Sequence, residues 1–313
     1  MESSPILVAV QCLVFNHEPY LRQCLDGFVM QKTNFRFVVI VHDDCSTDGS
    51  ASIIREYAEK YPNLFHVIIQ PQNLYSRGIS PTREYINPII EQLKPKYMAL
   101  CEGDDYWTDP LKLQKQVDFL ESHPDYSMCC HGADVLNETL REVDCACEHM
   151  TTREYLPDDA FPTWQIPTAS IVYKKKEVDT YTLKNADSFM AGDVVLILKC
   201  MHVGRVWGMS EHMSVYRMNP GGVTSRAETM ASRLKMCTHY EAMMANFPKI
   251  NTDYCHRFIA MVHYMNFRQT NDFKTKIISL WKAIMNKPDF VIRKVLKLKV
   301  KPRNDLFYQY YGQ

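Results

Sequence analysis

The chain has 313 residues, which is enough for one large domain with a sizeable core, or for one domain and an appendage. Apolar residues make up 46% of it and charged residues 23%, the proportions of an ordinary globular protein. Lysine and arginine total 36, as do aspartate and glutamate, so bulk charge gives no reason to expect a nucleic-acid partner.

Simple patterns exclude several other classes of protein. The N-terminus lacks a basic stretch followed by an apolar run, so we expect no signal peptide. No apolar run approaches the roughly 20 residues of a membrane span. The eleven cysteines form no CxxC pair, and Cys145-Ala-Cys147 with His149 lacks the spacing of a structural zinc site. Several cysteines lie in apolar runs, where thiols behave as small core residues, and we expect a cytoplasmic location.

The first hundred residues alternate apolar strands with amphipathic helices. Residues 6–14 form a continuous apolar run, which is typical of a strand buried on both faces, and similar runs follow at 35–41, 64–69 and 97–101. One helical pattern begins at Glu18-Pro19, a second follows the CSTDGS turn, and a third ends at Leu93. This alternation predicts an α/β fold with a mostly parallel, Rossmann-like sheet flanked by helices.

Acidic residues follow two of the predicted strands. Asp43 and Asp44 end the second strand, and Glu102, Asp104 and Asp105 end the fourth. Ligands of such sheets bind at the carboxyl ends of the strands, where carboxylates this close repel one another unless a cation lies between them. Oxygen ligands suit Mg²⁺ or Mn²⁺, which bind through one or two carboxylates and a substrate's phosphates. Each cluster alone could be a solvated turn, but two on one rim favour a metal–nucleotide site.

The glycine-rich loops that usually hold phosphates are missing. The sequence has no GxxxxGK[ST] motif and no GxGxxG after the first strand, which argues against P-loop NTPases and dinucleotide-binding domains. A HAD-type phosphatase would need a nucleophilic Asp where this chain has Phe15-Asn16. A diphosphate would therefore be held by a metal and by basic side chains such as Arg77 and Arg83.

Three motifs, VFNHEPYLRQCLDGF, HDDCSTDGS and CEGDDYWTDPLKL, occur in this order, and with them the chain resembles the family 2 glycosyltransferases of the GT-A fold. The resemblance covers roughly residues 5–225. It implies that Asp44 and Phe15 contact the base of a nucleotide-sugar. It also implies that Glu102-Gly103-Asp104 is the DxD motif, which binds the ribose and a divalent metal. Glu102 departs from that motif, and we expect Asp104 and Asp105 to hold Mg²⁺ or Mn²⁺.

The second half of the resemblance concerns the acceptor. Residues 186–203 predict a helix whose early turn holds Gly192 and Asp193. Taken alone, Asp193 is an ordinary helix-start acid, but the family places its catalytic base here. The resemblance thus implies inverting transfer of a sugar, from a UDP-sugar, to a hydroxyl of a saccharide or lipid-linked saccharide in surface polysaccharide biosynthesis. Many relatives carry His where this chain has Asn219, so we expect no histidine contact there.

The C-terminal part has a different composition. We expect a GT-A domain at 1–225, with a nucleotide-binding half at about 1–125 and an acceptor half at about 126–225, followed by a helical region at 226–313. Met and aromatic stripes in that region predict interhelical core. Between Trp281 and Arg303, eight basic residues accompany one acid, Asp289. This segment is either an interfacial helix on the inner membrane surface or a solvated helical face.

Two other functions stay open at this point. A sugar nucleotidyltransferase would show a glycine-rich loop with a basic residue after the first strand, where this chain has VFNHEP. A non-catalytic sugar-nucleotide-binding protein is the other alternative. Only the candidate base Asp193 distinguishes the enzyme from it by sequence, so turnover must be measured. Pocket shape decides the sugar and the acceptor, and the sequence predicts neither.

Overall fold

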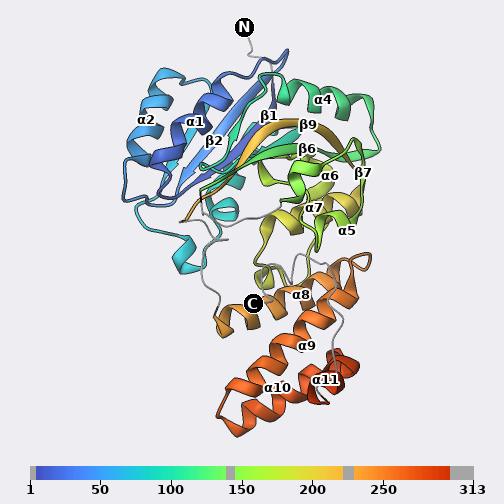
Figure 1. Cartoon of the computed structure of the whole chain (residues 1–313). Helices are drawn as coiled ribbons and strands as arrows, with labels where there is room; N and C mark the ends of the chain where they lie inside the picture. The colour runs from blue at the N-terminus through green and yellow to red at the C-terminus, as the bar shows by residue number, and fades with distance from the viewer. Residues whose placement is uncertain (1–4, 139–144, 221–228, 297–313) are drawn as a thin grey trace. The chain divides into compact units, whose positions relative to one another are not determined.

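The computed structural model describes residues 5–138, 145–220 and 229–296, and these form an α/β fold (Figure 1). The strands are β1 (Ile6–Val14), β2 (Arg36–Asp43), β3 (Phe65–Ile69), β4 (Tyr97–Leu100), β5 (Tyr106–Trp107), β6 (Tyr126–Asn137), β7 (Arg153–Tyr155), β8 (Val172–Lys174) and β9 (Arg205–Met218). The longer helices are α1 (Glu18–Val29), α2 (Ser50–Lys60), α3 (Asn87–Leu93), α4 (Lys112–Ser122), α7 (Gly192–Val203), α8 (Met230–Asn246), α9 (Thr252–Gln269), α10 (Phe273–Asn286) and α11 (Pro288–Val295). Shorter helical turns are η1 (Tyr75–Arg77), η2 (Thr82–Ile86), η3 (Ala146–His149), α5 (Pro157–Ala160), η4 (Thr168–Ser170), α6 (Lys175–Asp179) and η5 (Ala186–Ser188).

The described strands form one sheet in the order β3-β2-β1-β4-β8-β6-β9-β5, with β7 paired to β9. The first four strands of this order are parallel, and β8 is antiparallel to both its neighbours. β6 and β9 are again parallel, whereas β5 and β7 run antiparallel to β9. The prediction of a mostly parallel sheet flanked by helices is therefore confirmed.

Both faces of the parallel strands are covered, which explains their continuous apolar sequences. On one face, Val8 and Val10 of β1 belong to a core with apolar residues of α1, α2 and α4. On the other face, Ala9 packs with Ile86 of η2 and Ile90 of α3. Figure 1 shows α1 and α2 together on one side of β1 and β2. The core thus fixes where the strands end, and with them the loops that follow.

Two predicted elements differ from those observed. The second strand was expected to end at residue 41, but His42 and Asp43 still pair with Ile68 and Ile69 of β3. Residues 186–203 form a short turn, η5, and then α7 rather than one helix. At the break the chain is extended at Phe189, and the backbone N–H of Met190 donates to Nδ1 of the distant His239 at 3.3 Å.

The chain divides into two compact units, each described here by itself. The first comprises Met1–Tyr155, Gln165–Tyr181 and Cys200–Ser225, and the second comprises Leu156–Trp164, Thr182–Lys199 and Arg226–Gln313. The second unit thus takes two segments from before residue 226, where we had placed the start of the helical region. Aromatic packing joins one of them to the C-terminal helices, since the Phe161 ring lies 5.2 Å from that of Tyr240 and 5.3 Å from that of Tyr254.

The C-terminal helices have a compact core of small and apolar residues. Ala260 of α9, Ala283 of α10, and Phe290 and Val291 of α11 are buried together. The basic segment predicted from Trp281 onward is not one helix, because α10 ends at Asn286 and Pro288 starts α11. Its residues 297–303 lie outside the described part of the chain. Within the described ranges, no helix combines the length and the apolar character needed to cross a bilayer.

One charged residue lies inside the core of the first unit. Lys112, at the start of α4, is fully buried, and its Nζ donates to Oε1 of Gln116 at 2.8 Å. The same Nζ lies 4.1 Å from the centre of the Trp107 ring. Burial lowers the pKa of Lys112 to about 7, because the apolar surroundings disfavour the charged ammonium.

We expect this lysine to make stability depend on pH. Between pH about 7 and about 10.4, the unfolded chain holds a proton that the folded chain has lost, so the free energy of unfolding rises with pH, by at most about 1.4 kcal/mol per unit. Urea unfolding at pH 6.5–9.5 should therefore show wild type gaining stability relative to Lys112→Met. The control is Lys115→Met, whose amine is partly exposed and paired with Asp109. Parallel curves for wild type and Lys112→Met would contradict the low pKa.

Candidate functional site

The two acidic clusters meet at the carboxyl ends of β1, β2 and β4. The backbone continues the strand ladder beyond the strands: Asp44 N–H donates to the Val14 carbonyl at 2.9 Å, and Gly103 N–H donates to the Leu13 carbonyl at 2.9 Å. β1 lies between β2 and β4, so the segments after these three strands form one rim. The structure thus brings together the loops that the sequence predicted to share an edge.

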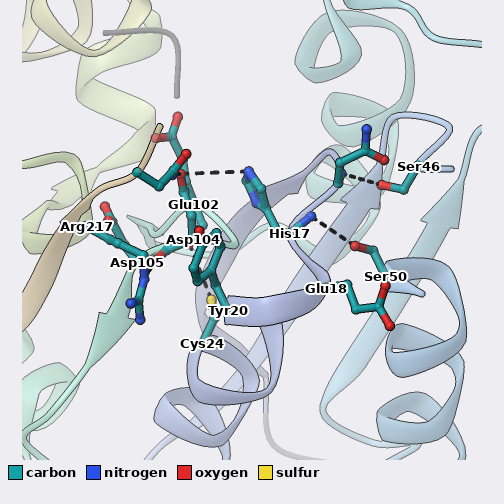
Figure 2. A network of polar contacts seen from close by, with 12 residues as sticks. His17, Glu18, Tyr20, Cys24, Ser46, Ser50, Glu102, Asp104, Asp105 and Arg217 are labelled. Carbon is teal, nitrogen blue, oxygen red and sulfur yellow. Dashed lines mark hydrogen bonds and ion pairs between the residues drawn. The ribbon is translucent and has the colours of Figure 1, made fainter. Parts of the chain in front are cut away.

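The loop after β1 is tied to the loop after β2. Asn16 N–H donates to Oγ of Ser46 at 2.8 Å, and His17 N–H donates to Oγ of Ser50 at 3.0 Å. Glu18 accepts a further bond from Gly49 N–H at 2.7 Å. Figure 2 shows His17 between these serines on one side and Asp104 on the other. His17 is therefore held by its backbone while its imidazole reaches the second acidic cluster.

Asp104 carries the central carboxylate of this rim. Its Oδ2 accepts a hydrogen bond from Nδ2 of Asn219 at 2.8 Å. The same oxygen lies 3.8 Å from Nε2 of His17 (Figure 2). The Asp104 side chain is partly exposed. A carboxylate offers about four acceptor sites, and these contacts leave room for a further partner. Glu102, two residues earlier, is exposed. The rim therefore has two carboxylate groups that are accessible to a bound molecule.

His17 sits among several negative charges. Burial lowers the pKa of its imidazole, while the carboxylates of Asp104, Asp48 and Asp43 oppose that shift. Its Nδ1 is buried and has no hydrogen-bond partner among the described residues. The same is true of Oδ1 of Asp43, whose Oδ2 accepts from Ser46 N–H at 3.1 Å. Two buried polar atoms beside the rim thus lack a hydrogen-bond partner among the described residues.

Gly103 is required by the space between these groups. A Cβ at this position would lie 2.8 Å from Nδ1 of His17 and 2.9 Å from Cγ2 of Val14, closer than real side chains approach. Any other residue would therefore displace either the His17 ring or the end of β1. The glycine lets the loop after β4 lie directly against the loop after β1.

Asp105 is placed differently from Asp104. It is only 2% exposed, and its Oδ1 accepts a hydrogen bond from the Arg217 backbone N–H at 2.8 Å. Burial raises the pKa of Asp105 well above its usual range, and the nearby carboxylate of Asp104 adds to the shift. Asp105 thus joins the loop after β4 to the end of β9.

The Arg217 side chain completes that connection. Its Nε donates to the Asp104 backbone carbonyl at 2.9 Å, Nη1 to Oε1 of Glu138 at 2.7 Å, and Nη2 to Oε1 of Gln23 at 2.8 Å. Its guanidinium also lies 4.6 Å from the centre of the Tyr20 ring. One buried cation therefore links α1, the residue after β6, the acidic loop and β9.

Asp44 is also engaged by backbone groups. Its Oδ1 accepts from Leu74 N–H at 2.7 Å and its Oδ2 from Tyr75 N–H at 3.0 Å. These bonds hold the loop after β3 against the end of β2, and each oxygen keeps acceptor capacity for a base. Phe15, the other residue expected at the base, is 40% exposed. Both assignments stay predictions.

The remaining predicted residues lie in other segments. Arg77 of η1 and Arg83 of η2 are exposed, and Nη1 of Arg77 donates to Oε1 of Gln72 at 2.5 Å. Asp193 lies in the first turn of α7, as predicted, and is partly buried. Because that turn belongs to the second unit, its position is described only within that unit. Its role as the base stays a prediction.

The donor set of the rim fits a hard divalent cation. Among the described residues, no three His, Cys, Asp or Glu side chains form a ready-made metal cage. Mg²⁺ and Mn²⁺ do not need one, since they bind through one or two carboxylates and complete their shell with phosphates and water. Glu102 and Asp104 supply such oxygens at the rim.

The sequence interpretation missed His17, Glu138 and Arg217. A usable signal existed for Arg217, because a charged residue inside the apolar strand pattern MSVYRM must find a buried partner. No comparable signal marked Glu138, which becomes significant only through its contact with Arg217. Asn219, where no histidine contact was expected, instead contacts Asp104 through its amide.

We expect loss of the Arg217 guanidinium to destabilise the first unit strongly. Arg217→Met removes the donor to the Asp104 carbonyl and the partner of Glu138, which is itself exposed, and should lower the free energy of unfolding by about 1.5–3 kcal/mol. Arg205→Met is the matched control, since Arg205 lies on the same strand but pairs with Glu154 and Asp125 in solvent. It should cost much less, because ion pairs in solvent contribute little to stability. Equal losses in urea unfolding would refute the central role of Arg217.

Comparison with known proteins agrees with this geometry. Residues 12–156 match the model of Glycosyl transferase family 2. The uncharacterized protein Rv1520 of Mycobacterium tuberculosis is 35% identical over 223 residues, which are 71% of this chain and 62% of that protein. This chain therefore spans less than two thirds of that relative. TuaG of Bacillus subtilis is 25% identical over 226 residues, 70% of this chain and 82% of TuaG.

Among solved structures, S. aureus TarS 1-349 in complex with UDP-GlcNAc superposes with a TM-score of 0.61. The match covers 91% of this chain and 83% of that one, at 18% identity, and so concerns the fold. Sequence motifs, sheet order and family match agree. Over residues 12–156 the chain thus resembles the family 2 glycosyltransferases, and its fold is the GT-A fold of TarS.

Proposed function

We propose that this protein transfers a sugar from a nucleotide-diphospho-sugar, a UDP-sugar, to a hydroxyl of a saccharide or lipid-linked saccharide, with inversion at the anomeric carbon. The observation that carries the proposal is the rim formed by the ends of β1, β2 and β4, where a partly exposed Asp104 carboxylate is held in place by Asn219. Open α/β sheets bind their ligands at this rim. The match of residues 12–156 to the family 2 glycosyltransferase model supports the reaction class.

The donor class rests on the relatives and on the residues at the rim. TarS was solved with UDP-GlcNAc, and TuaG is named as a teichuronic acid biosynthesis glycosyltransferase. In this chain, Asp44 would accept the ring N–H of uracil through its remaining lone pairs, and Phe15 would lie against the base. Arg77 and Arg83 are the exposed cations that would approach the diphosphate.

We further propose that Mg²⁺ or Mn²⁺ binds at Asp104, with Glu102 as a second oxygen donor. When bound, the ion supplies positive charge that stabilises the departing diphosphate. Of the two aspartates expected to hold it, Asp104 keeps the more accessible carboxylate. Asp105 is buried against the Arg217 backbone, which favours a positioning role for it. His17 and Asn219 orient the Asp104 carboxylate.

Asp193 is proposed as the general base. Its carboxylate lies in the first turn of α7. It would accept the proton of the acceptor hydroxyl as the oxygen attacks the anomeric carbon and the bond to the diphosphate breaks. A single displacement of this kind inverts the configuration. UDP is the leaving group, and the proton ends on Asp193.

The direct test is a panel of nucleotide-sugars incubated with the full chain and Mn²⁺, with released nucleotide measured by chromatography. We expect slow release of UDP from one UDP-sugar and faster release when a saccharide acceptor is added. Binding without release from any donor would favour a non-catalytic binding protein. Formation of a nucleotide-sugar from a sugar phosphate and a nucleoside triphosphate would instead show a nucleotidyltransferase.

The metal site can be tested by two isosteric substitutions. Asp104→Asn removes the charge that attracts the ion, and it should weaken UDP binding in Mn²⁺ by about tenfold or more. Asp105→Asn keeps an oxygen that can accept from Arg217 N–H, and it should retain most of the affinity. Calorimetry with and without chelator checks both. If UDP binds wild type equally well in either condition, the metal proposal fails; if Asp105→Asn alone loses affinity, Asp105 is the ligand.

For the base, Asp193→Asn keeps the size of the side chain but cannot take up a proton. We expect kcat to fall by about 10²–10⁴-fold while the affinity for UDP is unchanged. Asp187→Asn, in the exposed turn η5, is the control and should keep the wild-type rate. Transfer at the wild-type rate by Asp193→Asn would assign the base to another residue.

A further inference from the structure

Helix α10 presents its large apolar residues outward. Phe273 is 76% exposed and Trp281 is 60% exposed, and the residues at helical spacing from them are exposed as well. We call this surface the outward face of α10; its apolar members are Phe273, Ile277, Ile278, Trp281, Ile284 and Met285. These positions share one side of the helix, because residues three, four, seven and eight apart align. The interhelical core predicted here does not include them.

The opposite side of α10 explains this arrangement. Small residues face the neighbouring helices: Ala283 is buried in the core with Ala260, and Ser279 accepts from Nδ2 of Asn266 of α9 at 2.9 Å. Small side chains let the helices pack closely without the larger ones. Of the bulky apolar residues of α10, Leu280 packs against this core, whereas the six of the outward face are exposed. A contiguous group of exposed apolar side chains is typical of an interaction site.

The charges around this face indicate what it contacts. Between residues 273 and 296 the sequence has six basic residues and one acid, Asp289, in a chain of zero formal net charge. Lys274 is exposed and Lys282 partly exposed, and helical spacing places both beside the apolar stripe. A second copy of this face would bring these lysines against one another, which disfavours a symmetric dimer. An anionic surface complements both the charge and the apolar stripe.

We propose that the outward face of α10 docks the protein on an anionic lipid bilayer. Lysines bordering an apolar stripe with a tryptophan are the pattern of helices that lie in the membrane interface. The lysines contact acidic headgroups while Trp281 and its apolar neighbours enter the headgroup–acyl boundary. α11 adds an exposed stripe of its own, Ile292, Val295 and Leu296. This docking does not depend on the reaction proposed above.

The choice of variants for testing membrane docking follows from which residues are buried. Removing the chain after Lys287 would delete Phe290 and Val291, which are buried in the helical core, so a truncation would confuse docking with folding. Substitutions on the exposed face avoid this problem. Lys274→Glu with Lys282→Glu reverses two charges beside the stripe. Arg55→Glu with Lys60→Glu, on exposed positions of α2, is the control with the same change in net charge.

The experiment is co-sedimentation of the full chain with vesicles of phosphatidylcholine containing phosphatidylglycerol. We expect binding to these vesicles at low salt and little to pure phosphatidylcholine. The α10 reversal should lower the partition coefficient by at least about tenfold, and the α2 control should change it little. Brominated lipids should quench wild-type tryptophan fluorescence more than that of Trp281→Phe, because Trp281 enters the boundary. Circular dichroism confirms that each variant is folded.

Several results would overturn the proposal. They are absence of binding at low salt, equal losses from the α10 and α2 reversals, and quenching that does not depend on Trp281. A concentration-dependent dimer that Ile277→Asp dissociates, with no binding to vesicles, would assign the outward face to a second copy of the chain. Binding that survives the α10 reversal would place the contact elsewhere on the protein.

Discussion

The candidate site depends on one buried cation. The Arg217 side chain is 5% exposed and donates to the Asp104 carbonyl, to Glu138 and to Gln23, while its backbone N–H is held by Asp105. A buried guanidinium would be costly without these partners, because it would lose its hydration without gaining hydrogen bonds. The contacts of Arg217 with Asp104 and Asp105 therefore hold the loop after β4 in place, and this positions the carboxylate of Asp104 at the rim.

Most of the fold could be predicted from the sequence because its signals are local. Continuous apolar runs, the Glu18-Pro19 helix start and turn residues after each strand indicate parallel strands alternating with helices. The errors came where a distant partner decides. β3 extends the pairing of β2 by two residues beyond its apolar run, and His239 meets the backbone at Met190, where a single helix was expected. Neither partner is visible in a local pattern.

The site was predicted in part, for the same reason. Acidic residues after two strands could be placed at one rim from topology alone. The different roles of Asp104 and Asp105 could not be predicted, because neighbouring carboxylates look alike in sequence. In the structure, Asp104 is partly exposed and Asp105 is buried. On α10, periodicity identified an apolar stripe but not its direction. The small residues Ser279 and Ala283 determine which side faces inward, and the apolar pattern alone does not show this.

β9 has a consequence for how this chain can change over evolutionary time. Its 14 residues pair with β5, β6 and β7, and its far end carries Arg217 and, one residue beyond the strand, Asn219. Side chains alternate between the faces of a strand, so deleting one residue before Arg217 would turn its guanidinium to the opposite face. Replacements at exposed positions of β9, such as Arg205, can be tolerated, whereas a change in the length of the strand would disconnect the acidic loop. Insertions and deletions among homologous chains should therefore accumulate in the loops, and the length of this strand should drift least.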